Sequence, residues 1–419
     1  MQGNGDRHNP SINIQCIVCH GENVEPFLDL GLTALANKFL SREELVLAEP
    51  TYPLRVGFCH NCRHVQLTEA VPPQTMFEDY LYVSSASDTL KAHLYDLSAI
   101  VVERYRLKSK DLVVDIGCND GTLLSGFRRH GVRVLGVDPA ANLAELTRAS
   151  GIDRYVGFFS AKSAQEIVAR WGKAAAITAT NTFPHIPKLQ DFIAGLKTIL
   201  APGGVFLIEA HYLVDLLEQG AFDTIYHEHV SYWALGPMIH LFEQAGMEVV
   251  HVERLPLHHG QIRVFLQRKG EGDVQTSVGN LLVMERSLGI DQFSTYQRFA
   301  ERTQKLKIDL HVKLRELRAS GKKLAGYGAP AKGNTLLSFL EIGPDILAYI
   351  ADRSTLKQGL YTPGRHIPVV SPERLLTDQP DYVLLLAWNF VDEILEQQQE
   401  YRRRGGKFII PVPEVRIVS

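Results

Sequence analysis

The sequence lacks the long hydrophobic runs that cross membranes. Its longest apolar stretches, such as residues 382–388, are far shorter than the roughly 20 residues needed to span a bilayer, so we expect no membrane association. Basic residues are not in excess either, because Lys and Arg total 44 against 47 for Asp and Glu. Nucleic acid is therefore disfavoured as a partner, since proteins bind its phosphates through Lys and Arg. The polar amino terminus also lacks the apolar core of a signal peptide, which favours a cytoplasmic protein.

Cysteine is scarce, with five in the chain. Four of the five form two Cys-x-x-Cys pairs, Cys16 with Cys19 and Cys59 with Cys62. Without an export signal a disulfide framework is not expected, whereas two such pairs supply four thiolates for tetrahedral zinc. Because four sulfurs close the coordination shell, we predict a structural zinc site that takes no part in the chemistry. Unrelated thiols or a redox pair are the alternatives.

With 419 residues the chain exceeds the size that one hydrophobic core normally serves, so we expect two or three domains. Strand patterns, one of them at residues 155–159, alternate with helical patterns between residues 111 and 209, which is typical of a doubly wound parallel sheet. A second alternation begins near residue 323, after a long charged helical pattern at residues 282–317 that we interpret as a connector. The fold class is therefore α/β, with two Rossmann-like domains after an amino-terminal zinc-binding module.

Residues 111–124 carry the strongest cofactor signal. An apolar strand ends at Asp115, and Gly117, with a second glycine four residues later, lets the backbone turn into a helix. The next strand ends at Asp138, where a carboxylate can hold the two hydroxyls of a ribose. The glycine spacing differs from the dinucleotide pattern, so we predict a nucleoside cofactor without a pyrophosphate. The candidate cofactor-binding residues are Asp115, Gly117, Asn119, Asp138, Pro139 and Asn181.

Residues 222–233 gather two histidines, a glutamate and two tyrosines within a dozen positions. His227 and His229 lie two apart and would project to the same side of an extended segment, which suits a loop or strand rim rather than a helix. Histidine titrates near neutrality and is the commonest side chain for moving a proton at physiological pH. We therefore predict an active site where this stretch covers the carboxyl ends of the parallel strands. His185, Glu209 and His211 should rim the same crevice.

The second α/β domain contains a glycine-rich turn at residues 323–335. A helix after this turn would offer unpaired backbone amides to an anion, and Lys332 would add a positive charge. We predict that it binds a nucleotide phosphate; the alternative is a domain kept for scaffolding alone. The hydroxyl-rich residues 80–88 leave two interpretations open, a lid that faces the cofactor or sugar, or a plain linker capped by Ser87 or Asp88.

Together these motifs resemble those of the three-domain sugar C-methyltransferases. The resemblance covers the whole chain and rests on motifs in one order, namely the two cysteine pairs and residues 35–40, 82–87, 115–121, 226–232 and 326–333. Enzymes of this family contain zinc and use S-adenosylmethionine to methylate a nucleotide-linked 4-keto-6-deoxy sugar, as in the C-3 methylation of tetronitrose biosynthesis. The resemblance implies a zinc-binding module at residues 1–75 and a methyltransferase domain at 76–280. It also implies a carboxyl-terminal α/β domain at 281–419 that helps to bind the sugar nucleotide.

The resemblance also points to single residues. The catalytic residues carried over by motif are Tyr80, His185, Tyr226, Glu228 and His229. The candidate substrate-binding residues are Tyr82, Ser84, Ser85, Arg263, Tyr327, Gly328, Lys332 and Asn334. Residues 258–261 read His-His-Gly-Gln where the family has His-Gly-Gly-Ser. This departure leaves open the identity of the sugar, including whether its C-3 bears an amine or a hydroxyl. The nucleotide, dTDP or GDP, is open as well. We expect a monomer or a weak homodimer.

The expected reaction begins at a proton made acidic by the neighbouring ketone. We expect His229 to remove the C-3 proton and Glu228 to orient an imidazole. Tyr226 or His185 would stabilise the oxyanion at C-4. Glu209 and His211, at the rim of the same crevice, are alternatives for these roles. Two rival hypotheses remain, an O- or N-methyltransferase, which needs a base but no enolate stabiliser, and a non-catalytic zinc- and nucleotide-binding scaffold. The intact cofactor motif argues against the scaffold.

Overall fold

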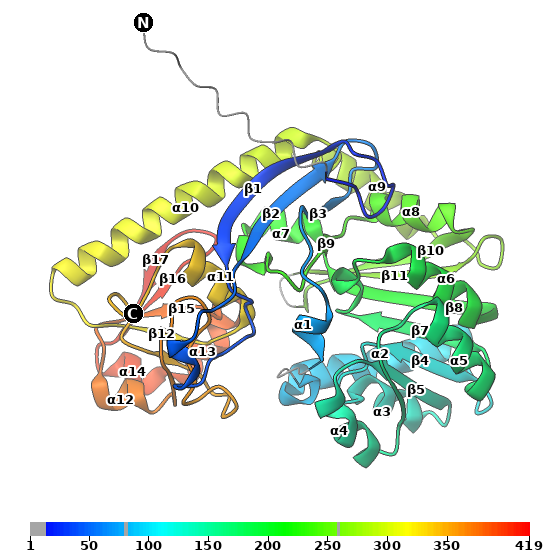
Figure 1. The fold of residues 1–419 in the computed structure, drawn as a ribbon, viewed down its shortest axis with the longest axis horizontal. Helices are drawn as coiled ribbons and strands as arrows, with labels where there is room; N and C mark the ends of the chain where they lie inside the picture. The colour runs from blue at the N-terminus through cyan, green and yellow to red at the C-terminus, as the bar shows by residue number, and fades with distance from the viewer. Residues whose placement is uncertain (1–13, 79–82, 258–259) are drawn as a thin grey trace, which may run out of the picture.

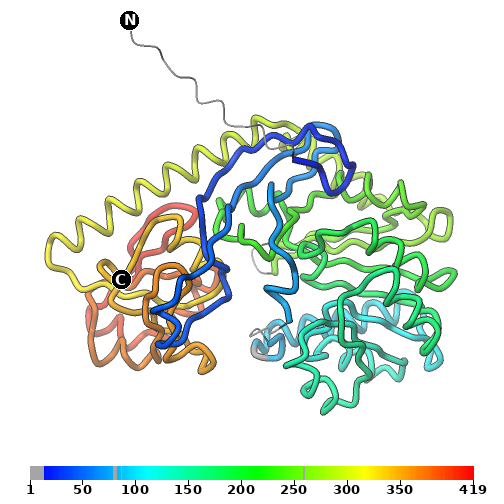
Figure 2. The backbone as a smooth tube through the Cα atoms, in the orientation of Figure 1, coloured from blue at the N-terminus to red at the C-terminus, as the bar shows by residue number. Residues whose placement is uncertain are grey.

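Three β-sheets organise the chain, one in its amino-terminal part and one in each of two lobes (Figure 1). The computed structural model describes residues 14–78, 83–257 and 260–419. In the backbone trace of Figure 2, the amino-terminal strands run between the first lobe and the carboxyl-terminal lobe. The amino-terminal sheet is therefore placed to contact both.

The amino-terminal sheet has four antiparallel strands in the order β1-β2-β3-β9. The strands are β1 (Val24–Thr33), β2 (Tyr52–Cys59), β3 (Val65–Leu67) and β9 (Ser231–Tyr232), with the short helices η1 (Glu44–Val46) and α1 (Gln74–Phe77). β9 belongs to the histidine-rich stretch at residues 222–233. This stretch therefore ends as a strand of the amino-terminal sheet, a pairing that its two residues of strand gave no pattern to predict.

The first lobe contains a seven-stranded sheet in the order β10-β11-β8-β7-β4-β5-β6. Its strands are β4 (Leu112–Ile116), β5 (Arg133–Asp138), β6 (Asp153–Val156), β7 (Ala174–Thr180), β8 (Leu200–His211), β10 (Met247–Leu255) and β11 (Gln261–Arg268). Strands β4 to β8 are parallel, and β11 is antiparallel to both its neighbours. All five residues of β4 are buried, as in a central strand covered on both faces. The predicted doubly wound sheet is confirmed. The strand predicted at residues 155–159 is wrong in its bounds, because β6 loses its partner where β5 ends at Asp138.

Helices connect these strands. They are α2 (Asp88–Tyr105), α3 (Thr122–Arg129), α4 (Ala144–Ala149), α5 (Ala161–Trp171), α6 (Leu189–Ile199), α7 (Leu213–Gln219) and α8 (Leu235–Gln244). Short helical turns are η2 (Ser84–Ala86), η3 (Ala141–Leu143), η4 (Phe183–His185) and η5 (Phe222–Thr224). The Ser87 hydroxyl accepts a hydrogen bond from the Leu90 N–H at 3.3 Å, so Ser87 is the cap of α2.

The second lobe contains a six-stranded sheet in the order β14-β13-β12-β15-β16-β17, parallel except for β17. Its strands are β12 (Leu324–Tyr327), β13 (Ile350–Ala351), β14 (Val369–Val370), β15 (Tyr382–Leu385), β16 (Lys407–Ile410) and β17 (Arg416–Val418). Its helices are α11 (Ala331–Phe339), α12 (Arg374–Asp378), η7 (Trp388–Phe390), α13 (Val391–Gln397) and α14 (Gln399–Arg403). The parallel order confirms a second Rossmann-like α/β fold.

The connector between the lobes consists of two helices, α9 (Thr276–Ser287) and α10 (Phe293–Ala319). The single helical pattern predicted for residues 282–317 is therefore wrong. Gly289 adopts φ of +66°, and its N–H bonds to the Arg286 carbonyl at 3.0 Å, which ends the first helix. Figure 1 shows α10 running along the edge of the molecule toward the second lobe.

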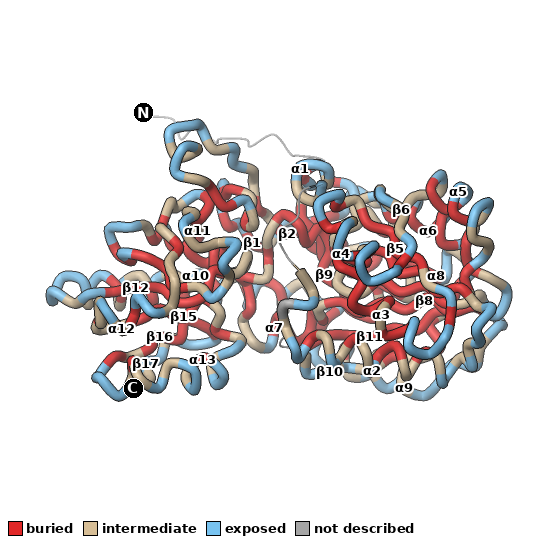
Figure 3. Tube along the Cα trace, turned by 90° about the horizontal axis from the view of Figure 1, so that it is seen from below, coloured by how far each residue is buried: buried red, intermediate tan, exposed pale blue. Residues whose placement is uncertain are grey.

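Burial follows the sheets of both lobes. In Figure 3 buried segments trace the central strands, whereas exposed segments lie along the outer helices and turns. Among the described residues, none of the helices combines the length and the apolar character that crossing a membrane requires.

Candidate functional site

The four paired cysteines meet in one cluster. The Sγ atoms of Cys16 and Cys62 lie 3.5 Å apart, those of Cys19 and Cys59 lie 3.6 Å apart, and all four lie within 4.8 Å of one another. A disulfide would need about 2.05 Å. Zinc with Zn–S bonds of about 2.3 Å places its sulfurs close to the observed separations. The cluster therefore fits a structural zinc ion.

A large cavity of about 1070 Å³ lies where the amino-terminal sheet and both lobes meet. Pockets that hold one small molecule usually measure about 300–1,000 Å³, so this cavity lies at the upper end of the usual size. Predicted site residues that line it are His229, Tyr226, His185, Asp115, Gly117, Asn119, Asp138, Pro139, Asn181, Ser84 and Lys332. Tyr80 and Tyr82 lie outside the described residues, as do His258 and His259.

The cofactor end of the cavity lies at the carboxyl ends of β4 and β5. Thr178 donates a hydrogen bond to the Asp115 carboxylate at 2.7 Å, and burial raises the pKa of Asp115 to about 7. The Asp138 carboxylate accepts hydrogen bonds from the backbone N–H groups of Asn119 and Ala140, both at 2.8 Å. Two carboxylates at neighbouring strand ends can accept hydrogen bonds from the hydroxyls of a ribose.

Two further residues shape the cofactor end. Arg154 donates a hydrogen bond to the Asp138 carboxylate at 3.0 Å, and its charge offsets part of the rise in pKa that burial causes at Asp138. Gly117 has φ of +76°, and a Cβ there would lie 2.0 Å from the Thr182 hydroxyl. Only glycine therefore allows this close approach. Sequence reasoning missed Arg154, because its partner lies on the neighbouring strand.

His229 lies at the centre of a group of rings. Its ring centroid lies 4.0 Å from that of Tyr226 and 5.2 Å from those of His185 and His211. Its Nδ1 lies 2.8 Å from the Thr224 carbonyl oxygen, which can only accept, so Nδ1 carries the proton and Nε2 does not. Burial, aided by His185, lowers the pKa of His229 to about 3. The ring is therefore neutral at physiological pH and presents an acceptor nitrogen.

The two histidines of the stretch do not share one side, so that prediction is wrong. The His229 N–H bonds to the Tyr226 carbonyl at 2.9 Å, which closes a turn and sends the side chains different ways. His227 donates through Nε2 to the Pro53 carbonyl of β2 at 3.2 Å. The Glu228 carboxylate accepts a hydrogen bond from the Asn37 side chain at 2.6 Å and does not line the cavity. The turn is thus held by the amino-terminal part of the chain.

Several predicted substrate-binding residues lie away from the cavity lining. Arg263 donates to the Glu209 carboxylate at 2.5 Å and to that of Glu253 at 2.8 Å, because its strand pairs it directly opposite Glu209. Asn334 donates a hydrogen bond to the Ala36 carbonyl at 2.7 Å. The Tyr327 hydroxyl accepts a hydrogen bond at 3.1 Å from the side chain of Gln398, the residue before α14. These three side chains are engaged within the protein.

Ser85 and Gly328 also lie outside the lining. The Ser85 N–H bonds to the Asp120 carboxylate at 2.9 Å, which fixes the backbone at the start of α2 while the residue itself is exposed. A Cβ at Gly328 would lie 2.6 Å from that of Ala387, so the glycine serves a close approach of two chain segments.

The opposite end of the cavity carries two lysines from the second lobe. Lys332 lies near the amino terminus of α11, and burial lowers its pKa to about 8, although Asp223 acts in the opposite sense. Lys357 donates a hydrogen bond to the Ala329 carbonyl at 2.8 Å, and burial lowers its pKa as well. Two ammonium groups beside a helix amino terminus are suited to an anion, and we call this part of the cavity the anion-binding end. Sequence reasoning missed Lys357, which no motif marks.

Comparisons with known proteins identify the family. Family models match at residues 16–77 ("Putative zinc binding domain"), 91–252 ("Methyltransferase domain") and 256–413 ("C-methyltransferase C-terminal domain"). Over 406 residues the chain is 39% identical to the C-methyltransferase NovU of Streptomyces niveus, with 97% of each chain covered. The chain belongs to the C-methyltransferase family.

Other known proteins match a smaller part of this C-methyltransferase. It is 24% identical over 163 residues to the ubiquinone biosynthesis O-methyltransferase of Burkholderia thailandensis, which covers 35% of this chain and 68% of that protein. A solved SAM-dependent methyltransferase from Anabaena variabilis covers 48% of this chain and 100% of its own, at 14% identity and a TM-score of 0.34. Of these three proteins, NovU alone matches nearly the whole chain.

This C-methyltransferase depends on S-adenosylmethionine and contains a structural zinc site. The carboxylates of Asp115 and Asp138 fit S-adenosylmethionine, because this cofactor has a ribose and no pyrophosphate. The four cysteine sulfurs fit a structural zinc ion, since a closed set of four thiolates leaves no coordination position for a substrate.

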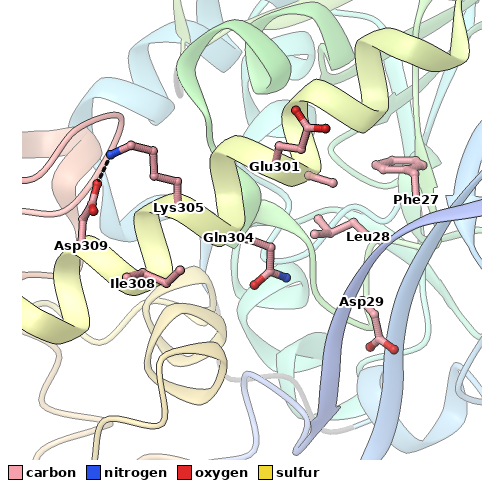
Figure 4. A pocket seen from close by; sticks show the side chains of 9 residues that line it. Phe27, Leu28, Asp29, Glu301, Gln304, Lys305, Ile308 and Asp309 are labelled. Carbon is pink, nitrogen blue, oxygen red and sulfur yellow. Dashed lines mark hydrogen bonds and ion pairs between the residues drawn. The ribbon is translucent and has the colours of Figure 1, made fainter.

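A second hollow, of about 550 Å³, lies between β1 and α10 and is shown in Figure 4. Its lining includes Phe27, Asp29 and Ile308, and an ion pair of 2.5 Å joins Lys305 to Asp309 along α10. It contains no histidine, and none of the predicted catalytic residues line it. The predicted catalytic residues His185, Tyr226 and His229 line the larger cavity instead.

We expect Asp138→Ala to weaken S-adenosylmethionine binding in this C-methyltransferase. A hydrogen bond to a charged group contributes about 1.5–3 kcal/mol, so the dissociation constant should rise roughly 10- to 150-fold. Calorimetry measures this rise directly. Asp153→Ala is the matched control, because the Asp153 carboxylate on the neighbouring strand β6 is exposed and accepts a hydrogen bond from Trp171. Equal affinity in both variants would contradict the role of Asp138.

Proposed function

We propose that this C-methyltransferase methylates C-3 of a nucleotide-linked 4-keto-6-deoxy sugar, carried on dTDP or GDP, with His229 as the base. The proposal rests above all on the tautomer of His229, whose Nδ1–H is bound to the Thr224 carbonyl while Nε2 is unprotonated. A buried neutral imidazole can take a proton from carbon where that proton is acidic, as it is beside a ketone. This base lies in one cavity with the cofactor end and the anion-binding end.

The anion-binding end supports a nucleoside diphosphate as the carrier of the sugar. Lys332 and Lys357 supply two positive charges, and the amino terminus of α11 adds unpaired backbone N–H groups. Asn389 and Phe390 of η7 line the same end and offer an amide and a ring to a nucleobase. The sugar of such a substrate would extend toward the histidine group, with the cofactor beyond it.

The residues divide the work of the reaction. Nε2 of His229 takes the C-3 proton, and the electron pair of that C–H bond moves to form the enolate, with negative charge on the C-4 oxygen. Tyr226 or His185, whose rings pack around His229, would donate a hydrogen bond to that oxygen. Bound S-adenosylmethionine would supply an electrophilic methyl group to C-3, and S-adenosylhomocysteine would leave with the electron pair of the broken methyl–sulfur bond. The negative substrate also raises the pKa of His229 and so favours the protonated imidazole that results.

The test is a panel of dTDP- and GDP-linked 4-keto-6-deoxy sugars incubated with methyl-labelled S-adenosylmethionine. We expect label on C-3 of one substrate class, with the position fixed by NMR. A methyl group on oxygen or nitrogen would replace the proposal with an O- or N-methyltransferase, and transfer to substrates without a nucleotide would remove the role of the anion-binding end.

Binding of the nucleotide should weaken above pH 8. Lys332 has a lowered pKa of about 8 in the ligand-free protein, so its positive charge is lost as the pH rises through this value. The affinity for dTDP or GDP, measured by calorimetry from pH 7 to pH 9.5, should therefore fall across that range. Lys332→Arg should flatten the fall, because arginine stays charged throughout. The exposed Lys305→Arg is the control, and an unchanged wild-type affinity up to pH 9.5 would contradict the prediction.

A further inference from the structure

Trp388 lies between a buried carboxylate and a lysine of the anion-binding end. Its indole Nε1–H donates to Oδ2 of Asp223 at 2.7 Å. The ammonium of Lys332 lies 4.2 Å from the centroid of its ring. Asp223 is fully buried, and within the described part of the chain its Oδ1 has no hydrogen-bond partner. The carboxylate of the first lobe, the indole of the second and the ammonium beside the cavity thus form one connected group.

Asp223 is also next in sequence to the residue that holds the proposed base, His229. Asp223 lies in the helical turn η5, and the next residue, Thr224, offers the carbonyl that holds Nδ1–H of His229. Phe222, on the preceding side, packs against Phe339 of α11 with ring centroids 5.3 Å apart. The turn that orients the catalytic imidazole is therefore docked on the second lobe by its two neighbouring side chains, one apolar and one charged.

We propose that Asp223 is a positioning residue that couples the charged anion-binding end to the orientation of His229. The inference rests on the proposed function. In the absence of nucleotide, Asp223 favours the charged form of Lys332, which keeps an ammonium ready for the diphosphate. Through Trp388 the same carboxylate fixes η5, so that the Thr224 carbonyl stays in place and Nε2 of His229 stays unprotonated.

The protonation of Lys332 makes the coupling measurable. Lys357 and Asp352 lie on the segment that follows β13. The Asp352 carboxylate accepts the Ala329 N–H at 2.5 Å and acts on Lys357. Asp223 is the carboxylate that acts on Lys332 directly. Removing its charge therefore lowers the proton affinity of that lysine, whereas a loss of packing would relieve its burial and raise it.

Asp223→Asn keeps the shape and an oxygen that can accept from Trp388, but removes the charge. We expect two changes. The pH at which dTDP or GDP binding falls by half should move below the wild-type value. Because a neutral amide oxygen accepts a weaker hydrogen bond than a carboxylate, η5 should also be held less firmly, and C-3 proton exchange in deuterated water should fall roughly 10- to 100-fold at saturating substrate. S-adenosylmethionine affinity should stay as in wild type. Asp309→Asn, on α10 away from the cavity, is the control.

Trp388→Phe separates the two effects, because it removes the hydrogen bond and leaves the carboxylate charge. It should lower proton exchange without moving the midpoint of nucleotide binding. Asp223→Asn could fail to fold, which a loss of S-adenosylmethionine binding would reveal. In that case Trp388→Phe alone decides, and proton exchange at the wild-type rate in Trp388→Phe overturns the coupling. An unmoved midpoint in folded Asp223→Asn also overturns it, while the proposed substrate class stands. If wild-type protein binds neither dTDP nor GDP, the proposed substrate class fails, and the coupling fails with it.

Discussion

His229→Ala is expected to abolish methyl transfer while the protein still binds S-adenosylmethionine. A general base contributes roughly 10²- to 10⁴-fold to a rate, and the loss should lie at the upper end, because Nε2 of His229 is the acceptor nitrogen at the centre of the ring group. The measurement is proton exchange at C-3 in deuterated water, followed by NMR, together with methyl transfer. Wild-type protein should exchange or methylate this position, and the variant should do neither.

The control for this experiment is His240→Asn, a histidine on α8 whose ring pairs with Gln244 outside the cavity. It should exchange and methylate as wild type does. Normal exchange in His229→Ala, with exchange lost in Tyr226→Phe or His185→Ala, would show that the base is one of the neighbouring groups. Loss of exchange together with loss of cofactor binding would point to collapse of the cavity and contradict a purely catalytic role.

Cys59→Ser should have the second large effect, because the zinc cluster is joined to the turn that carries His229. Cys59 ends β2, which pairs with β3, and β3 pairs with β9 directly after the turn. The Leu67 N–H also bonds to the Val230 carbonyl at 3.0 Å, one residue beyond His229. Structural zinc contributes about 10–16 kcal/mol to the folding of zinc-finger peptides at neutral pH. We therefore expect the variant to lose zinc and to unfold at a markedly lower temperature.

Metal analysis and thermal unfolding measure these losses. Wild-type protein should hold about one zinc per chain, as a four-thiolate site requires. Cys118→Ala is the matched control, since the fifth cysteine is buried in the first lobe outside the cluster and should leave the zinc content unchanged. Well-folded, metal-free Cys59→Ser protein with full methyl transfer would refute a structural role for the cluster.

The sequence determined the parts of this protein that depend on local order. Two Cys-x-x-Cys pairs foretold the zinc cluster, because each pair already brings two sulfurs within one short turn. The buried strands that carry Asp115 and Asp138 near their carboxyl ends predicted the cofactor end, since parallel strands present these ends at one edge of the sheet. Alternating strand and helix patterns were enough to predict both Rossmann-like folds. Such features follow from hydrophobic periodicity and glycine conformation over a few residues.

Only the tertiary structure decided the protonation of His229 and the partners of the polar side chains at the site. The tautomer of His229 depends on the Thr224 carbonyl, and therefore on a turn that the sequence pattern had predicted as extended. Lys357 reaches the cavity from a segment without any motif, and Asn37 lines it although the motif at residues 35–40 gave it no predicted role. Arg263 looked available for substrate, yet the strand register sets it opposite Glu209, which neutralises it inside the sheet. Contacts of this kind join residues that are distant in the sequence.

The physical reason lies in how such contacts form. The Trp388 indole meets Asp223 only because the second lobe packs on the turn η5, and the two residues are 165 positions apart. No local preference of either residue selects the other. Hydrophobic packing of whole elements, as between Phe222 and Phe339, sets which polar groups lose water together, and only then do hydrogen bonds and charges determine their partners and pKa values.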